Sequence, residues 1–335
     1  MFKKMKKGLL VIMAIIICLS LLAGCSTKAP ASGSTSTPAP EPEKKTFKVG
    51  YSIDTISTPF NAKAYEQMAA EWKNHPEVTL YTTEARGQAI KQVSDIEDLI
   101  SKGVDLLIVK PRDEKTLAST LSSAYKQGIK VVLIDRVIDS EDYNTRVVTD
   151  NTEVGILSAE YMAKAIGGKG NVCIAEGTPG ASSYLERTKA FVETMSKYPD
   201  IKIIAQQPSN AKRDEGKTLA ENWIQAYGDK ISGIHSNADE ITMGIIQAIE
   251  QAGKTGKIKV TSITGLMEAV PAVKNGQIDQ VATITNGVRI GVDAAWKLLN
   301  GEEVPKKIIV PSVTITKDNA DKYYQQDKYL VDEVL

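Results

Sequence analysis

Residues 104–136 read VDLLIVKPRDEKTLASTLSSAYKQGIKVVLIDR, two short apolar runs with a helical pattern between them. The runs at 104–111 and 130–136 are rich in Val, Ile and Leu, which is typical of parallel strands covered on both faces. Residues 114–127 have helical spacing, and Gly128 follows where a left-handed residue ends a helix. This stretch therefore predicts one strand–helix–strand unit with parallel strands.

The same alternation continues on both sides of this unit, from Phe47 onward. Further strands are predicted at 47–53, 78–84, 146–150, 171–177, 201–208, 231–237, 258–265, 279–285 and 308–316. Further helices are predicted at 87–102, 152–166, 182–197, 213–227, 239–252, 267–275 and 287–300. These strand–helix units are too many for a single lobe. We therefore predict an α/β fold of two doubly wound parallel-sheet lobes that divide near residues 149–152.

The composition excludes several classes of function. The chain has 335 residues with 41 Lys and Arg against 41 Asp and Glu, so no basic excess points to nucleic acid. Its two histidines, His75 and His235, are far apart in sequence, which argues against a His-rich metal site or a His-based catalytic triad. We therefore predict no metal and no cofactor.

The first 25 residues have the layout of an export signal. A basic start, MFKKMKK, precedes the apolar run 8–24, which is typical of a secretory signal peptide. This run is just long enough to cross a bilayer, so an uncleaved membrane anchor is the alternative. Leu22-Ala23-Gly24-Cys25 resembles the lipobox of bacterial lipoproteins. That resemblance implies that residues 1–24 are removed and that a lipid on Cys25 anchors the chain to the outer face of the cell membrane.

The residues after the leader predict a tether. Residues 25–45 are rich in Ser, Thr, Pro and Ala and cannot bury enough apolar surface to fold, so we expect a disordered segment. Cys18 lies in the leader and Cys25 carries the lipid, which leaves Cys173 without a disulfide partner. Its apolar surroundings predict a buried, inert thiol.

Functional candidates follow from the topology, because ligands of open parallel sheets bind beyond the carboxyl ends of the strands. The residues there are rich in Asp, Asn, Arg and Gln, with a few aromatic side chains. Carboxylates and amides pair with hydroxyls, arginine donates in a fixed fork, and an aromatic ring covers the C–H face of a sugar. These segments are 54–61, 110–113, 135–136, 150–151, 176–184, 207–213, 237–240, 264–268 and 286–289.

Over about residues 46–316 the chain resembles the periplasmic sugar-binding family of ATP-driven importers, of the ribose- and galactofuranose-binding type. The motifs that carry the resemblance are VGYSIDTISTPFNAKAYEQM, VDLLIVKP, KVVLIDR, TDNTEVGILSAEYMAK, GTPGASSYLERTKAF, SNADEITMGIIQAIEQAG and VATITNGVRIG. The resemblance implies two lobes, 46–150 plus 287–312 and 151–286 plus 313–335. Three crossing strands would form the hinge, and the lobes would close on the ligand.

The resemblance also implies the ligand-binding residues. In the first lobe and the hinge these are Asp54, Phe60, Asn61, Asp135, Arg136 and Asn286. The second lobe departs from the family pattern, because a ligand-facing arginine, aromatic, asparagine and aspartate fall on Leu185, Ala211, Ala238 and Thr264. Tyr184, Asn237 and Asp239 are the replacements that we expect to contact the ligand.

Three of these assignments have simpler alternatives. The pair Asp135 and Arg136 can be a surface ion pair at a strand end. Phe60 can be a core residue. Asp239 and Glu240 can stabilise the start of the helix that follows them, where acidic side chains are favoured.

The sequence therefore predicts a lipid-anchored, extracytoplasmic and monomeric solute-binding protein. It would capture a sugar or polyol and deliver it to a membrane permease with a cytoplasmic ATPase, as in an ABC importer. One alternative is a sensor that presents a nucleoside or furanosyl signal to a membrane receptor, and another is a secreted sugar-processing enzyme. A transcription regulator with this two-lobed core is disfavoured by the leader and by the absence of a basic helix-turn-helix segment before residue 46.

Overall fold

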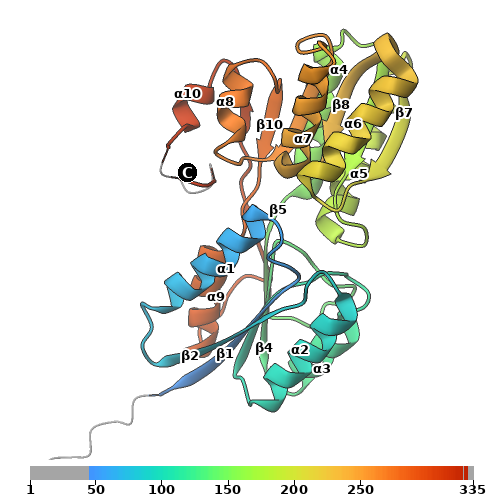
Figure 1. The fold of residues 1–335 in the computed structure, drawn as a ribbon. Helices are drawn as coiled ribbons and strands as arrows, with labels where there is room; N and C mark the ends of the chain where they lie inside the picture. The colour runs from blue at the N-terminus through green and yellow to red at the C-terminus, as the bar shows by residue number, and fades with distance from the viewer. Residues whose placement is uncertain (1–44, 327, 331–335) are drawn as a thin grey trace, which may run out of the picture. The chain divides into compact units, whose positions relative to one another are not determined.

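The computed structural model describes residues 45–326 and 328–330. The predicted leader, the predicted lipidation site Cys25 and nearly all of the predicted tether lie outside these residues. Within them, no helix is both long enough and apolar enough to span a membrane. The strands form two six-stranded sheets, which we call the first and second sheet (Figure 1).

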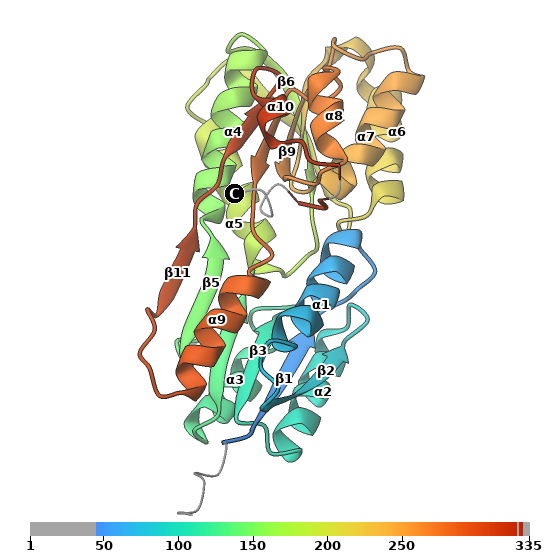
Figure 2. The ribbon, with the colours of Figure 1, turned by 90° about the vertical axis from the view of Figure 1, so that its left-hand side faces the viewer.

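The first sheet is entirely parallel and has the strand order β11-β5-β4-β3-β1-β2. Helices α1 and α9 pack on one face, and α2 and α3 on the other (Figures 1 and 2). The strands are β1 (Phe47–Ile53), β2 (Val78–Glu84), β3 (Leu106–Lys110), β4 (Lys130–Ile134), β5 (Thr145–Thr149) and β11 (Lys307–Val310); the helices are α1 (Pro59–Trp72), α2 (Ala89–Ser101), α3 (Ala118–Lys126) and α9 (Val288–Leu299).

The alternation of side chains along β3 shows why its apolar run is unbroken. Leu106 and Ile108 pack toward α1 and α9, whereas Leu107 and Val109 pack toward α2 and α3. All four side chains are fully buried. A strand with helices on both faces needs apolar side chains at every position.

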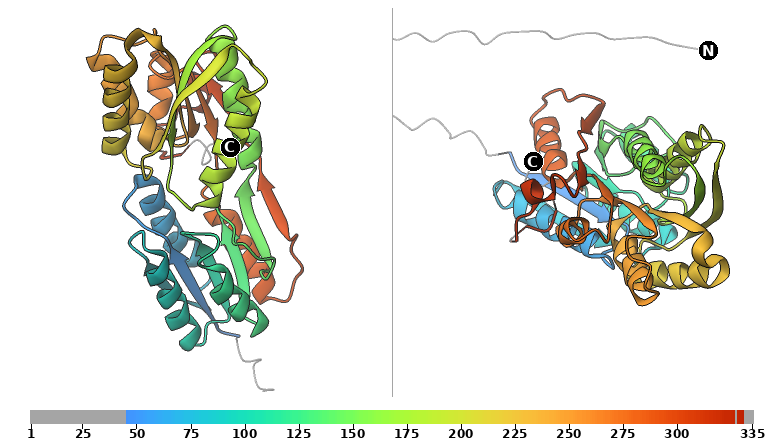
Figure 3. Two further views of the ribbon diagram at one scale, coloured as in Figure 1. Left: turned by 90° about the vertical axis from the view of Figure 1, so that its right-hand side faces the viewer. Right: turned by 90° about the horizontal axis from the view of Figure 1, so that it is seen from above.

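The second sheet has the order β12-β10-β9-β8-β6-β7 and is parallel except for the antiparallel pair β10 and β12. Helices α4 and α5 lie on the side of the sheet opposite to α6 and α7 (Figure 3). The strands are β6 (Gly170–Glu176), β7 (Ile201–Pro208), β8 (Ile231–Ser236), β9 (Lys259–Thr264), β10 (Gln280–Thr283) and β12 (Thr314–Thr316); the helices are α4 (Asn151–Ala165), α5 (Ser182–Met195), α6 (Arg213–Tyr227), α7 (Asp239–Gln251), α8 (Ala269–Lys274), α10 (Ala320–Tyr323) and the 3-10 turn η1 (Gly228–Lys230).

The two sheets confirm the predicted α/β class with doubly wound lobes. The chain passes between the sheets at 149–151, 283–288 and 310–314. Two of these links are joined where the Thr285 amide donates to Thr149 Oγ1 at 3.1 Å. A hydrogen bond from the Val313 amide to Thr283 Oγ1, at 2.9 Å, joins the third link to β10.

Most predicted elements lie within a few residues of the observed ones, but one predicted strand was wrong and two helices, α1 and α10, were missed. The run 308–316, expected as one strand, is two strands in different sheets, because Pro311 has no amide hydrogen to continue a ladder. Helix α1 was not predicted. Its start is marked by Thr58, whose Oγ1 accepts from the Asn61 amide, followed by Pro59 at the first helical position.

Cys173 lies in β6 and is fully buried, as predicted. Burial raises the pKa of its thiol to about 12, so the thiol stays protonated and unreactive at neutral pH.

Candidate functional site

The carboxyl ends of three neighbouring strands bring four charged side chains together. Asp54 follows β1, Lys110 ends β3, and Asp135 and Arg136 follow β4. Their side chains are between 1% and 8% exposed. Asp135 and Arg136 are therefore not a surface ion pair, and that alternative was wrong.

Within this cluster, the shortest ion pairs join residues far apart in the chain and not the neighbours Asp135 and Arg136. Arg136 Nη1 lies 2.8 Å from Asp54 Oδ2, and Lys110 Nζ lies 2.7 Å from Asp135 Oδ2. Arg136 Nε is 3.8 Å from Asp135 Oδ2 and donates no hydrogen bond among the described residues. The backbone of Asp135 is in the left-handed region, with φ 63°, and its carboxylate lies closer to Lys110 than to Arg136. The guanidinium therefore keeps a buried donor without an acceptor.

The start of α1 supplies two side chains to this cluster. Asn61 Oδ1 accepts from Lys110 Nζ at 2.6 Å, and Asn61 Nδ2 donates to Asp54 Oδ1 at 3.3 Å. The Phe60 ring lies under the ammonium of Lys110, 4.8 Å from ring centroid to Nζ. Phe60 also packs on the apolar cluster of the second sheet. The Phe60 ring therefore packs against the core of the second sheet and also forms one wall of the site.

The neighbouring charges favour the ionised forms of Asp135 and Arg136. Burial raises the pKa of the Asp135 carboxyl, but Lys110 and Arg136 outweigh this effect and lower it. For Arg136, burial opposes the charged form, yet Asp54 and Asp135 raise the pKa of the guanidinium. Burial lowers the pKa of Lys110, and Asp135 opposes that shift. Fixed charges in a region of low dielectric interact strongly with any polar group placed between them.

The second sheet contributes the opposite wall. The Tyr184 ring lies between two guanidinium groups, with centroid distances of 5.7 Å to Arg136 and 5.3 Å to Arg187. Arg187 is held by Asn151 Oδ1 at 2.9 Å and by the Asn237 carbonyl at 3.1 Å. The Tyr184 ring packs against Gly177. A Cβ at residue 177 would lie 2.3 Å from the ring, so only glycine fits at this position.

Residues from both sheets line one crevice between these walls. The space left between the side chains is about 30 Å³. Beside it, the Val137 amide donates to Ser182 Oγ at 3.0 Å, and Arg112 Nη1 donates to the Pro179 carbonyl at 2.9 Å. The crevice is lined by Asp54, Thr55, Thr58, Phe60, Asn61, Lys110, Asp135, Arg136, Thr178, Ser183, Tyr184, Arg187, Asn210, Ala211, Ala238, Glu240, Thr264 and Ile284.

Six of the nine expected ligand-binding residues line this crevice, and Asn237 and Asn286 are two that do not. Asn237 Nδ2 donates to Thr188 Oγ1 at 2.7 Å, and its Oδ1 lies 3.2 Å from His235 Nε2. Asn286 Nδ2 donates to Gln67 Oε1 at 2.9 Å, and its Oδ1 accepts from the amide at the start of α9. Both amide groups therefore make their hydrogen bonds within the protein.

Asp239 is the third expected residue that does not line the crevice. Its carboxylate accepts from the Gly265 and Leu266 amides at 2.8 Å and from Ser262 Oγ, so it fixes the loop after β9. Asp239 and Glu240 stand in the first turn of α7, where acidic side chains are favoured, but neither is the N-cap, which is Ala238 and makes no side-chain bond. Glu240 instead lines the crevice, where burial, aided by the Glu268 carboxylate, raises its pKa to about 7.

The crevice also contains residues that were not expected from the sequence to contact a ligand. Lys110, Thr178, Ser183, Asn210 and Glu240 all lie in segments after predicted strands. That position was the available signal, but it applies to many residues and does not indicate which side chains point inward. Among the described residues, no group of His, Cys, Asp and Glu is arranged to hold a metal ion.

Comparisons with known proteins agree with this geometry. A family model described as a periplasmic binding protein domain matches residues 49–303. A xylitol-binding protein of Mycolicibacterium smegmatis is 32% identical over 280 residues, which cover 82% of this chain and 79% of that protein. A ribose import binding protein of Bacillus subtilis is 30% identical over 311 residues, or 92% of this chain and 98% of that protein. The crystal structure of a galactofuranose binding protein, at 28% identity, covers 82% of this chain and 96% of its own, with a TM-score of 0.78. The chain therefore belongs to the periplasmic binding protein family.

Proposed function

We propose that the chain is an extracytoplasmic solute-binding lipoprotein that captures a sugar or polyol between two lobes and delivers it to an ABC importer. The lobes are 46–150 plus 287–312 and 151–286 plus 313–335, and they act as one monomer. The observation that carries the proposal is the buried crevice, in which ionised carboxylates, an ammonium and guanidinium groups meet two aromatic rings. The family is one of binding proteins, and we assign no catalysis to the crevice.

The chemistry of the crevice suits a ligand with adjacent hydroxyl groups. Asp54 and Asp135 supply acceptors, and Arg136 Nε is a buried donor without an acceptor among the described side chains. Hydrogen bonds to charged groups stabilise a complex more than neutral ones. The rings of Phe60 and Tyr184 can cover the C–H faces of the ligand. Xylitol and ribose, after which the two related proteins are named, have this chemistry.

The size of the crevice makes opening a necessary step. About 30 Å³ holds one or two water molecules and no sugar ring. The walls must therefore separate before a ligand enters, and the three links between the sheets are the places where the backbone can bend. A ligand then favours the closed form because contacts to both walls exist only there. Cys25, through its lipid, would hold the protein at the membrane beside the permease.

A thermal-unfolding screen tests the proposal. The panel contains xylitol, D-ribose, D-allose, myo-inositol and L-arabinose, with adenosine and guanosine as representatives of nucleosides. We expect one sugar or polyol to raise the melting temperature, since a ligand at 100 times its Kd adds about 2.7 kcal/mol to the stability. Asp54→Asn should remove this shift, whereas Asp95→Asn, far from the crevice, should keep it.

Three outcomes would contradict parts of the proposal. If no sugar or polyol shifts the melting temperature, or if the ligand is recovered chemically altered, the binding function is wrong. If only a nucleoside binds, the sensor alternative takes its place. If deletion of the gene leaves uptake of the labelled ligand unchanged, the protein binds that ligand without delivering it.

A further inference from the structure

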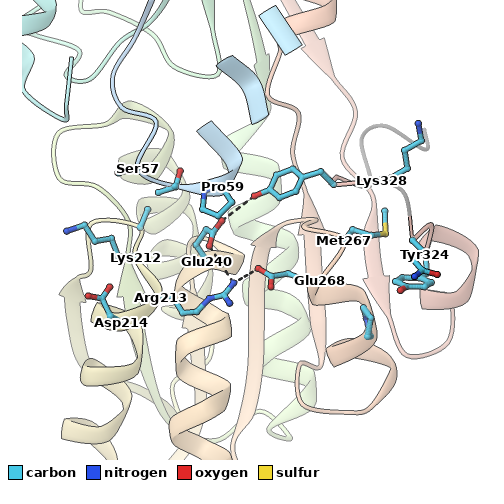
Figure 4. A pocket seen from close by; sticks show the side chains of 15 residues that line it. Ser57, Pro59, Lys212, Arg213, Asp214, Glu240, Met267, Glu268, Tyr324 and Lys328 are labelled. Carbon is cyan, nitrogen blue, oxygen red and sulfur yellow. Dashed lines mark hydrogen bonds and ion pairs between the residues drawn. The ribbon is translucent and has the colours of Figure 1, made fainter. Parts of the chain in front are cut away.

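A second and larger pocket adjoins the crevice. It measures about 730 Å³, and we call it the outer pocket (Figure 4). Ser57, Thr58 and Pro59 of the first lobe face Arg213, Glu240 and Glu268 of the second across it. Its volume lies within the range of 300–1,000 Å³ that is usual for small-molecule sites. Both lobes thus border this pocket as well as the crevice.

The two pockets share part of their lining. Thr58, Ala211 and Glu240 border both the crevice and the outer pocket. Ala211 is 6% exposed and its side chain is a single methyl group, so little material separates the two spaces at this point. A larger side chain at residue 211 would stand between them. The outer pocket is therefore placed to receive whatever extends out of the crevice past Ala211.

The polar groups of the outer pocket gather around one guanidinium. Arg213 Nη2 makes an ion pair with Glu268 and lies 3.7 Å from Glu240 Oε2 (Figure 4). Tyr329 donates its hydroxyl to Glu240 Oε1 at 3.3 Å. The Glu240 side chain is 8% exposed, whereas those of Arg213 and Glu268 are 40% and 42% exposed. The outer pocket thus offers a nearly buried carboxylate and two accessible partners at its junction with the crevice.

The charges and apolar groups of the outer pocket favour a neutral hydroxylated ligand. Two carboxylates share one guanidinium, so acceptors for hydroxyl groups exceed the local positive charge. Over the whole lining, Lys212, Arg213 and Lys328 balance Asp214, Glu240 and Glu268, so no net charge selects an ionic ligand. Pro59, Met267 and Pro271 supply an apolar surface of the kind that C–H faces of a sugar contact.

From this juxtaposition we propose that the outer pocket is a second subsite and that the preferred ligand is a neutral glycoside, such as a disaccharide or a glycosylated polyol. Its first unit lies in the crevice and its second unit in the outer pocket, with the linkage passing Ala211. The inference rests on the proposed sugar-binding function and specifies its substrate class. Since both lobes border each subsite, a ligand of two units would add contacts in the closed form beyond those of a single unit.

Matched pairs of ligands test this inference by calorimetric titration of the protein. The pairs are D-xylose and xylobiose, xylitol and xylobiitol, D-galactose and lactose, and myo-inositol and galactinol. In at least one pair we expect the two-unit ligand to bind at least tenfold more tightly than the single unit. Tyr324→Ala should weaken the two-unit ligand about fivefold without changing the Kd of the single unit, because Tyr324 is 45% exposed and lines the outer pocket but not the crevice.

Two further variants complete the test. Ala211→Phe should raise the Kd of the two-unit ligand more than that of the single unit, because the ring blocks the junction. Glu250→Gln, an exposed change at the far end of α7, should alter neither. If single units bind and every two-unit ligand binds equally or more weakly, the second subsite does not exist although the proposed function stands. If no ligand of either size binds, the proposed function itself fails.

Discussion

The substitution Asp135→Asn tests whether the buried charge cluster is held together by the pair of Lys110 and Asp135. Asparagine keeps the size of the side chain and tolerates the left-handed backbone at φ 63°, so the change removes the charge and adds little strain. It leaves the Lys110 ammonium, whose side chain is 3% exposed, facing a neutral amide at the position of the carboxylate. Removing one partner of a buried ion pair costs about 3–5 kcal/mol.

Proton loss from Lys110 sets an upper limit on this cost. If Lys110 loses its proton, no unpaired charge remains buried. Deprotonating a lysine costs about 1.36 kcal/mol for each pH unit below its ordinary pKa of 10.5. The limit is about 5 kcal/mol at pH 7 and about 2 kcal/mol at pH 9. A lysine whose pKa is lowered in the folded state binds fewer protons there than in the unfolded chain. The stability lost by the variant is therefore regained as the pH rises.

Urea unfolding followed by circular dichroism at pH 7 and pH 9, without ligand, measures both effects. We expect a loss of about 3–5 kcal/mol at pH 7 and of less than about 2 kcal/mol at pH 9. Lys110→Met combined with Asp135→Asn should be more stable than Asp135→Asn alone at pH 7, because no unpaired charge remains.

Asp95→Asn serves as the control, since its partner Lys91 is 36% exposed. Breaking this surface pair should cost less than about 1 kcal/mol at either pH. A loss below 1 kcal/mol for Asp135→Asn at pH 7, or a loss that grows toward pH 9, would refute the reasoning.

Three further predictions concern stability and location. Gly244→Ala should lower the unfolding free energy by at least ~3 kcal/mol, since its Cβ would lie 1.9 Å from the Arg213 carbonyl oxygen. Gly253→Ala, which has open space around the Cβ but a φ of 64°, should lower it by only about 1–2 kcal/mol. Equal losses of the two variants in urea unfolding would contradict this. Burial lowers the pKa of His235 to about 3, so below pH 6.5 the unfolded chain binds a proton that the folded chain does not. Stability should therefore fall as the pH falls toward 3. The melting temperature of His235→Gln should fall less steeply over the same pH range. Cys25→Ser should move the protein from the membrane fraction to the medium without changing its ligand Kd, and continued membrane association would instead indicate an uncleaved helix.

The local pattern of the sequence was sufficient for much of the fold. The run at 104–111 contains β3, and the run at 130–136 contains β4, because unbroken Val, Ile and Leu suit strands covered on both faces. Gly128, expected to follow the end of the helix at 114–127, has the left-handed backbone that this position favours, with φ 92°. The pattern failed at 308–316, where apolar spacing does not show that the chain changes sheet.

The candidate site was less predictable from the sequence. The position of a residue after a strand places it at one edge of the sheet, but it does not determine which side chain that residue will contact. Asp54, Asp135 and Arg136 were expected at one edge of the sheet, and they meet there. Asp239 has the same kind of position after β8, yet its carboxylate turns inward to hold a loop. The sequence order pairs Asp135 with its neighbour in the chain, whereas the register of β3 beside β4 gives it Lys110.

The amino-acid sequence alone therefore determined the alternation of elements and the edge at which polar residues collect, since both depend on residues close together in the chain. The tertiary structure decided which side chains point into the crevice, which carboxylate neutralises which cation, and that Ala211 joins the crevice to the outer pocket. Those features depend on strand register and backbone dihedral angles across residues far apart in sequence, which no local pattern records.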